Sequence, residues 1–108
     1  MTTGVALVLR VFLDDPAVPV YGFELMQRTR SPSGTVYPIL ARLERAGWIT
    51  GQLEMPDDAS REGRPRRRLY RLTAEGSVAA RTALTELSAR LQPSPVSGIR
   101  LRHTWREA

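Results

Sequence analysis

The sequence contains no cysteine, no lysine and a single histidine, His103. Without cysteine, disulfides, thiolate metal sites and cysteine nucleophiles are all excluded, which fits a reducing cytoplasm. The lone histidine has no serine-base arrangement around it in chain order, and no glycine-rich phosphate cradle is present. We therefore expect no enzyme activity, no cofactor and no bound metal.

Long hydrophobic runs are also missing from the chain. The apolar run at residues 4–13 is too short to span a bilayer, and Arg10 interrupts it. The sequence therefore predicts neither a membrane segment nor a signal peptide.

Because lysine is absent, all 16 basic residues are arginines, and they outnumber the 11 acidic residues to give a net charge of +5. Such an excess in 108 residues favours polyanionic partners, of which nucleic acid is the commonest. The planar guanidinium group suits phosphates and guanine edges, although a GC-rich genome explains the arginine usage better. The length allows one domain with a modest core, which association with a second copy would support.

The spacing of apolar residues predicts a mainly α fold with one small β-hairpin. Residues 56–65, which are polar and rich in turn formers, predict a mobile loop between the two strands. The predicted helices cover residues 3–13, 21–29, 33–46 and 73–92, and the predicted strands cover residues 49–55 and 67–72. This order is typical of a winged helix-turn-helix with an additional C-terminal helix. Residues 1–92 would form the DNA-binding domain, and residues 93–108 a flexible basic tail.

The third predicted helix has two different faces. One face is apolar and should pack on the core, with Val36, Ile39, Leu40 and Leu43 at helical spacing. The opposite face carries Arg42 and Thr35 and should be free to approach base edges in a major groove.

Arginine is concentrated in the second half of the predicted hairpin. Residues 61–71 contain six arginines and one acidic residue, a net charge of +5 that equals the net charge of the whole chain. Such a concentration favours contact with phosphates or a minor groove, and a solvated strand face is the simpler alternative.

Three segments resemble the PadR-like family of transcriptional regulators, in particular its short, single-domain members. They are YGFEL at residues 21–25, GTVYPILARLERAGWI at residues 34–49 and RRLYRLTAEG at residues 67–76. The resemblance implies a winged helix that binds palindromic double-stranded DNA as a homodimer and represses transcription, in the cytoplasm and at the nucleoid. Half-sites would lie about 34 Å apart. The matching positions imply DNA contacts from Ser33, Thr35, Tyr37, Pro38, Arg42, Arg64, Arg66, Arg67 and Arg68.

The first and last helices are predicted to form the dimer interface. The first is apolar nearly all round, so its burial needs partners on most sides, and the last carries an apolar stripe. The predicted interface residues are Leu9, Phe12, Ala80, Leu84, Leu87 and Leu91.

Three questions remain open: whether the protein binds an effector, what Tyr37 does, and whether the partner is DNA or a protein. The resemblance implies that some members bind planar aromatic effectors in the dimer crevice, where Trp105 of the tail would stack on the ligand. For Tyr37, a role in packing and a role at a DNA phosphate are equally compatible with the pattern. The alternative function is a winged-helix module that binds a protein without specific DNA binding.

Overall fold

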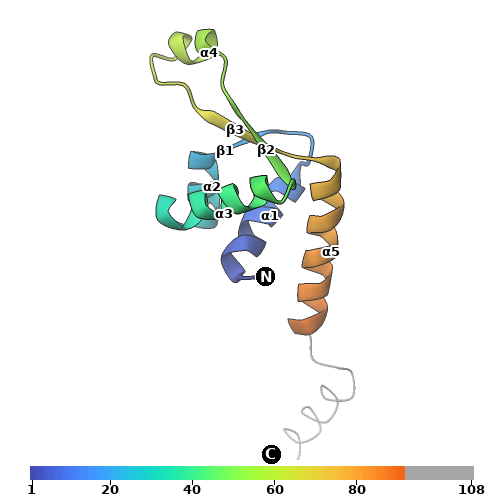
Figure 1. The fold of residues 1–108 in the computed structure, drawn as a ribbon. Helices are drawn as coiled ribbons and strands as arrows, with labels where there is room; N and C mark the ends of the chain where they lie inside the picture. Colours follow the sequence, from blue (N-terminus) through green and yellow to red (C-terminus); the bar gives the residue numbers. More distant parts are fainter. Residues whose placement is uncertain (92–108) are drawn as a thin grey trace, which may run out of the picture.

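The computed structural model describes residues 1–91 and confirms the mainly helical fold with a small antiparallel sheet (Figure 1). The helices are α1 (Thr3–Asp14), α2 (Gly22–Thr29), α3 (Ser33–Arg45), α4 (Pro56–Arg61) and α5 (Ala74–Leu91). The strands are β1 (Val20–Tyr21), β2 (Ile49–Leu53) and β3 (Arg68–Leu72). Helices α1 to α3 pack together, β2 and β3 form the wing that projects from them, and α5 leaves on the other side. No helix within residues 1–91 is long and apolar enough to cross a membrane.

Helix α1 lies at the centre of the protomer's own core. The Thr2 hydroxyl oxygen caps the helix by accepting a hydrogen bond from the Val5 amide at 3.2 Å. Leu9 and Phe12 are 0% and 1% exposed among α2, α3 and the sheet. Their predicted place at a dimer interface is therefore wrong, because side chains of the same protomer already cover them. The predicted place of Ala80 at the interface is wrong for the same reason, since this residue of α5 is also 0% exposed.

Helix α3 buries the predicted face. Val36, Ile39, Leu40 and Leu43 are all buried, and together with Leu25 of α2 they join the core formed with α1. Removing each such side chain from water contributes about 1.5–3 kcal/mol. This burial fixes the rotation of α3 about its axis and leaves the opposite face in solvent.

The sheet contains a strand that the sequence did not predict. Strand β1 pairs with β3, with Val20 opposite Tyr70 and Tyr21 opposite Leu69, so the strand order is β1-β3-β2. Two residues are too few to show an alternating pattern, and their partners lie about 50 positions further along the chain. Strand β1 runs directly into α2 and thereby ties the start of that helix to the wing.

The tip of the wing is a short helix, where the sequence predicted a mobile loop. Pro56 occupies the first turn of α4, Asp57 and Asp58 lie beside it, and Ala59 is 2% exposed. Gly63 then turns the chain back with a φ of 65°. Proline and aspartate are favoured in the first turn of a helix as well as in turns, which explains the wrong prediction.

Helix α5 begins in close contact with the end of α3. The Thr73 hydroxyl donates to the Gly47 carbonyl at 2.7 Å and accepts from the Gly76 amide at 2.9 Å. A β-carbon on Gly76 would lie 1.9 Å from the Trp48 carbonyl oxygen, so only glycine allows this approach. Gly76 and Ala80 are the only fully buried residues of α5, and the rest of the helix extends away from the core (Figure 1).

Replacing Gly76 with alanine should destabilise the fold. The new methyl group meets backbone atoms of Trp48, which cannot move without separating α5 from α3, so we expect a loss of about 1–3 kcal/mol. Urea unfolding followed by circular dichroism measures the loss. The control is Gly34→Ala, where a β-carbon has no neighbour within 4 Å, so stability should be unchanged or slightly higher. Equal stability of the two variants would contradict the assigned contact.

Candidate nucleic-acid interface

The solvent face of α3 carries the residues expected to meet DNA. All five predicted side chains are exposed: Ser33, Thr35, Tyr37, Pro38 and Arg42. Ala41 and Arg45 lie on this face as well. Pro32 precedes the helix and supplies no side-chain cap, so the positive end of the helix dipole faces solvent. The face therefore offers donors and positive charge on a rigid element.

Tyr37 both packs and remains accessible, so a role in packing and a role at a DNA phosphate do not exclude each other. Its ring lies across Gly22, where a β-carbon would be 2.6 Å from the tyrosine hydroxyl oxygen. The side chain is nevertheless 44% exposed. Glycine at the start of α2 thus allows the ring and its hydroxyl to rest against the backbone while part of the side chain stays at the surface.

The positive charge of the wing is smaller than the run of arginines suggests. Across residues 49–72, the six arginines face four acidic residues, three of which lie outside the 61–71 window, so the hairpin as a whole carries +2. The fold places several of these acids directly against the arginines. Most of the predicted concentration of free charge is thereby neutralised within the wing.

Arg64 is a structural residue of the wing. Its guanidinium donates to both carboxylate oxygens of Glu54, at 2.5 and 2.8 Å, and its Nε donates to Glu62 at 2.8 Å. Its side chain is only 21% exposed. The hydrogen bonds that Arg64 donates to Glu54 and then to Glu62 raise its pKa above the ordinary range, so it stays charged. Because Nε and both terminal nitrogens of Arg64 already donate to carboxylates, few of its donors are free for a phosphate.

Arg67 and Arg68 also have partners within the protomer. The guanidinium carbon of Arg67 lies 3.7 Å from the centre of the Tyr21 ring, and its Nη2 is 3.5 Å from Glu54. Arg68 crosses Gly51 and donates to Glu44 of α3 at 3.1 Å. These contacts hold the two side chains in place at the base of the wing.

Arg66 differs from its neighbours because no carboxylate pairs with it. Its Nε donates to the Glu54 carbonyl at 2.8 Å, and the residue is exposed. Within residues 1–91, Arg42, Arg45 and Arg66 form no salt bridge. These three arginines are consequently available to an external anion, as are exposed Arg30 before α3 and Arg71 on β3, which form no salt bridge within residues 1–91 either.

The unpaired Arg66 opens onto a small hollow between the start of α2, helix α3 and strand β3. The hollow has a volume of about 240 Å³. Its wall contains Tyr21, Phe23, Tyr37, Arg66, Arg67 and Arg68. The exposed face of α3 and the base of the wing therefore meet in a basic, aromatic depression.

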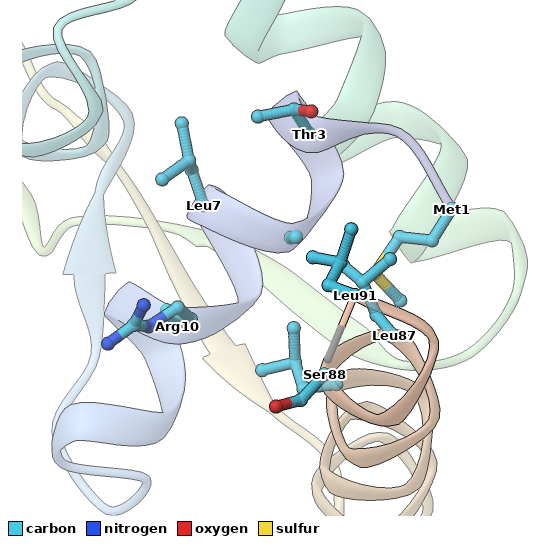
Figure 2. A pocket seen from close by; sticks show the side chains of 9 residues that line it. Met1, Thr3, Leu7, Arg10, Leu87, Ser88 and Leu91 are labelled. Carbon is cyan, nitrogen blue, oxygen red and sulfur yellow. The ribbon is translucent and has the colours of Figure 1, made fainter. Parts of the chain in front are cut away.

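A second, larger cleft lies between α1 and α5 (Figure 2). Its volume is about 630 Å³, and it is lined by apolar side chains together with Arg10, Thr3 and Ser88. Met1 extends across it towards Leu87 and Leu91 (Figure 2). Of the predicted interface residues, Leu84, Leu87 and Leu91 line this cleft, and Leu7 joins them although the sequence did not single it out. Trp105 and the predicted tail lie outside the described residues.

The fold and the basic face define a winged-helix DNA-binding transcription regulator. The chain belongs to the transcriptional regulator PadR-like family, whose profile matches residues 13–82. The match includes α2, α3 and the whole wing. A search of curated proteins finds no significant match.

Solved structures with the same fold share little sequence with this chain. AF1382 from Archaeoglobus fulgidus has a TM-score of 0.66 at 17% identity, over 86% of this chain and 93% of that chain. MepR, a transcription regulator of the Staphylococcus aureus multidrug efflux pump MepA, has a TM-score of 0.61 at 17% identity, over 99% and 76%. PcaV, a transcriptional regulator from Streptomyces coelicolor solved with its natural ligand, has a TM-score of 0.60 at 19% identity, over 98% and 73%. These similarities independently support the winged-helix fold.

The ion pair between Glu54 and Arg64 should make stability depend on pH in acid. Hydrogen bonds from Arg64, and then from the Arg67 amide and the Tyr21 hydroxyl, outweigh burial and lower the pKa of Glu54 from 4.5 to about 2. Because the folded pKa lies below the ordinary value, the ionised carboxylate stabilises the fold fully above about pH 4.5. This contribution is lost as the pH falls towards about 2.

The measurement is urea unfolding of the wild type and Glu54→Gln over a pH series. The wild type should be more stable by a constant amount above about pH 5, and the difference should shrink below about pH 4.5. Glu62→Gln is the control, because its carboxylate is exposed and should give a smaller difference. A difference for Glu54→Gln that does not change down to about pH 2.5 would contradict the assigned pKa.

Proposed function

We propose that this protein binds palindromic duplex DNA as a homodimer and represses transcription, acting in the cytoplasm and at the nucleoid. In this proposal the exposed face of α3 enters the major groove, and the base of the wing follows the adjacent backbone. The observation that carries it is the rigid, solvent-facing side of α3, which has unpaired Arg42 and Arg45 and shares a hollow with unpaired Arg66 through Tyr37. Major-groove recognition requires such a combination of a fixed helix and free donors.

Fluorescence anisotropy with labelled duplexes tests this function. Regulators of this family commonly control their own genes, so the first duplex is the region upstream of the protein's own gene, and the second is its scrambled sequence. Tighter binding to the upstream region supports sequence-specific regulation. Absence of binding to either duplex at low salt would instead favour the protein-interaction module.

The cleft between α1 and α5 is the proposed dimer interface. Helix α5 has 18 residues, but its buried residues, Gly76 and Ala80, lie in the first two turns, and Leu84 is only partly buried against the core. Because helices in proteins are stabilised mainly by packing of an apolar face, the later turns of α5 favour a further partner. Leu7 and Leu91 are 40% and 74% exposed along the cleft, so a second copy would cover apolar surface that the protomer leaves in solvent.

The same cleft is also the proposed place for a small effector. Its volume of about 630 Å³ falls within the range of about 300–1,000 Å³ typical of small-molecule pockets. Its mostly apolar wall, with Arg10 at the edge, suits a planar aromatic compound that bears a negative group. Trp105 remains a proposed stacking partner, and Trp105→Ala tests it through the response of DNA binding to candidate ligands.

Replacing both Leu84 and Leu87 with aspartate should prevent dimerisation. Two buried carboxylates at the interface would be desolvated without partners, so the dimer should give way to monomer or aggregate. Sedimentation velocity at tens of micromolar protein, a range suited to regulators of this kind, measures the outcome. Val78→Asp is the control, because Val78 is 66% exposed on the same helix and does not line the cleft. A monomeric wild type at these concentrations would rule out the interface.

Replacing Arg42 with alanine should reduce sequence preference. If its guanidinium contacts a base, the loss on the specific duplex should be about 1–3 kcal/mol, with a much smaller loss on the scrambled duplex. Arg81→Ala is the control, because it removes the same charge from an exposed position on α5. Equal losses on the two duplexes would show that Arg42 contacts only the backbone.

A further inference from the structure

The hollow between α2, α3 and the wing base has the chemistry of an anion site. Three arginines and the hydroxyl of Tyr37 line it, and none of its described lining residues is acidic. Its volume of about 240 Å³ lies below the usual range for drug-sized ligands, about 300–1,000 Å³. The hollow is thus suited to one small charged group.

Three of its side chains have hydrogen-bond donors without an acceptor among the described residues. Among the hydrogen bonds of residues 1–91, Arg66 uses only its Nε, which leaves both terminal nitrogens free. The Tyr37 hydroxyl makes no hydrogen bond to the described residues, and it lies on the α3 side of the same hollow. The buried Nε of Arg67 also lacks an acceptor within this part of the chain. An oxygen-rich anion would satisfy donors of this kind.

Glu54 organises the basic wall of the hollow from behind. Its carboxylate is held by Arg64 and accepts from the Tyr21 hydroxyl at 3.2 Å and the Arg67 amide at 3.4 Å. Its backbone carbonyl accepts from Arg66. Glu54 is only 4% exposed, so it cannot itself meet an anion in the hollow. Glu54 thus contacts Arg64, Tyr21, Arg66 and Arg67, and the last three line the hollow.

The start of α2 adds to the same potential. Helix α2 begins at Gly22 without a side-chain cap, and Gly22 and Phe23 line the hollow. The positive end of its dipole therefore lies beside the three arginines.

We propose that this hollow binds one backbone phosphate of duplex DNA, with Arg66 and Tyr37 as direct donors and Glu54 as the positioning residue behind them. The proposal rests on the DNA-binding function proposed above. A phosphate held here would lie between α3 and the wing, and it would fix the distance of α3 from the groove.

The variant Glu54→Gln distinguishes a positioning role of Glu54 from the effect of its negative charge, because the two change the affinity for DNA in opposite directions. Removing a negative charge from the wing should by itself tighten binding to any duplex. An amide, however, places an N–H group against the Arg64 donors and loosens the wall, so binding should weaken by about three- to tenfold. Glu62→Gln removes an equal charge from an exposed position of the same wing and should bind equally or more tightly. Thermal unfolding of each variant establishes that it is folded at the assay temperature.

Arg66→Ala and Tyr37→Phe test the direct donors at exposed positions, where folding is not at risk. On a random duplex, Arg66→Ala should flatten the plot of log affinity against log salt by about 0.9. Tyr37→Phe should weaken binding without changing this slope, because it removes no charge. Since both donors bind one phosphate, the double variant should lose less affinity than the product of the two single losses.

The outcomes distinguish this site from the general function. A wild type that binds no duplex overturns both proposals. If the wild type binds but Glu54→Gln tightens binding as Glu62→Gln does, the positioning role is wrong. If the losses at Arg66 and Tyr37 multiply independently, the shared phosphate is wrong, and DNA binding stands. Inorganic phosphate should compete no better than chloride at equal ionic strength, and selective competition would instead identify a site for free phosphate.

Discussion

The rest of the structure depends on the packing of the apolar face of α3 against α1 and α2. Val36 and Leu40 are almost completely inaccessible between α1 and α2. Rotating α3 would expose their apolar surface to water at a free-energy cost of several kcal/mol. The opposite face is therefore presented at a fixed angle. Gly22 extends this constraint to α2, because the absence of a β-carbon lets the Tyr37 ring rest against the backbone. A recognition surface can be specific only if its donors are held in this way.

The wing shows why the net charge of a sequence segment does not measure the charge available to a partner. The arginine-rich strand faces acids from the other half of its own hairpin, and Glu54 both pairs with Arg64, which Glu62 also holds, and approaches Arg67. Paired arginines supply fixed geometry, whereas unpaired Arg66 supplies attraction. A hairpin of only unpaired cations would repel itself and lack a defined shape. The pairing reduces long-range attraction and in return gives the wing a definite position beside α3.

Local patterns predicted the long elements, and contacts between distant segments account for most of the errors. Helix α4 is the exception, because proline and aspartate suit the first turn of a helix as well as a loop. The 3.6-residue periodicity of α3 and the end of that helix before Gly47 are properties of the helix itself. Strand β1 depends on a partner far along the chain, so nothing within its two residues announces it. The apolar surface of α1 correctly predicted burial, but periodicity cannot say whether the same protomer or a partner covers Leu9 and Phe12. The exposed face of α3 was predictable for the same local reason, whereas the ion pairs of Arg64 and Arg68 were not.

Helix α5 connects the proposed dimer cleft to the DNA-binding face through one tight contact. Gly76 lies against the Trp48 carbonyl, which also accepts the Thr73 amide at 3.0 Å, and the Trp48 amide donates to Leu43 at the end of α3. The direction of α5 is thus coupled to that of α3 by backbone atoms, which deform little. A partner bound along α5 would set the separation of the two recognition helices, which must match about 34 Å on DNA. A ligand in the α1–α5 cleft that altered how two copies pack would change this separation without touching the recognition surface, and regulation of DNA binding would follow from the geometry alone.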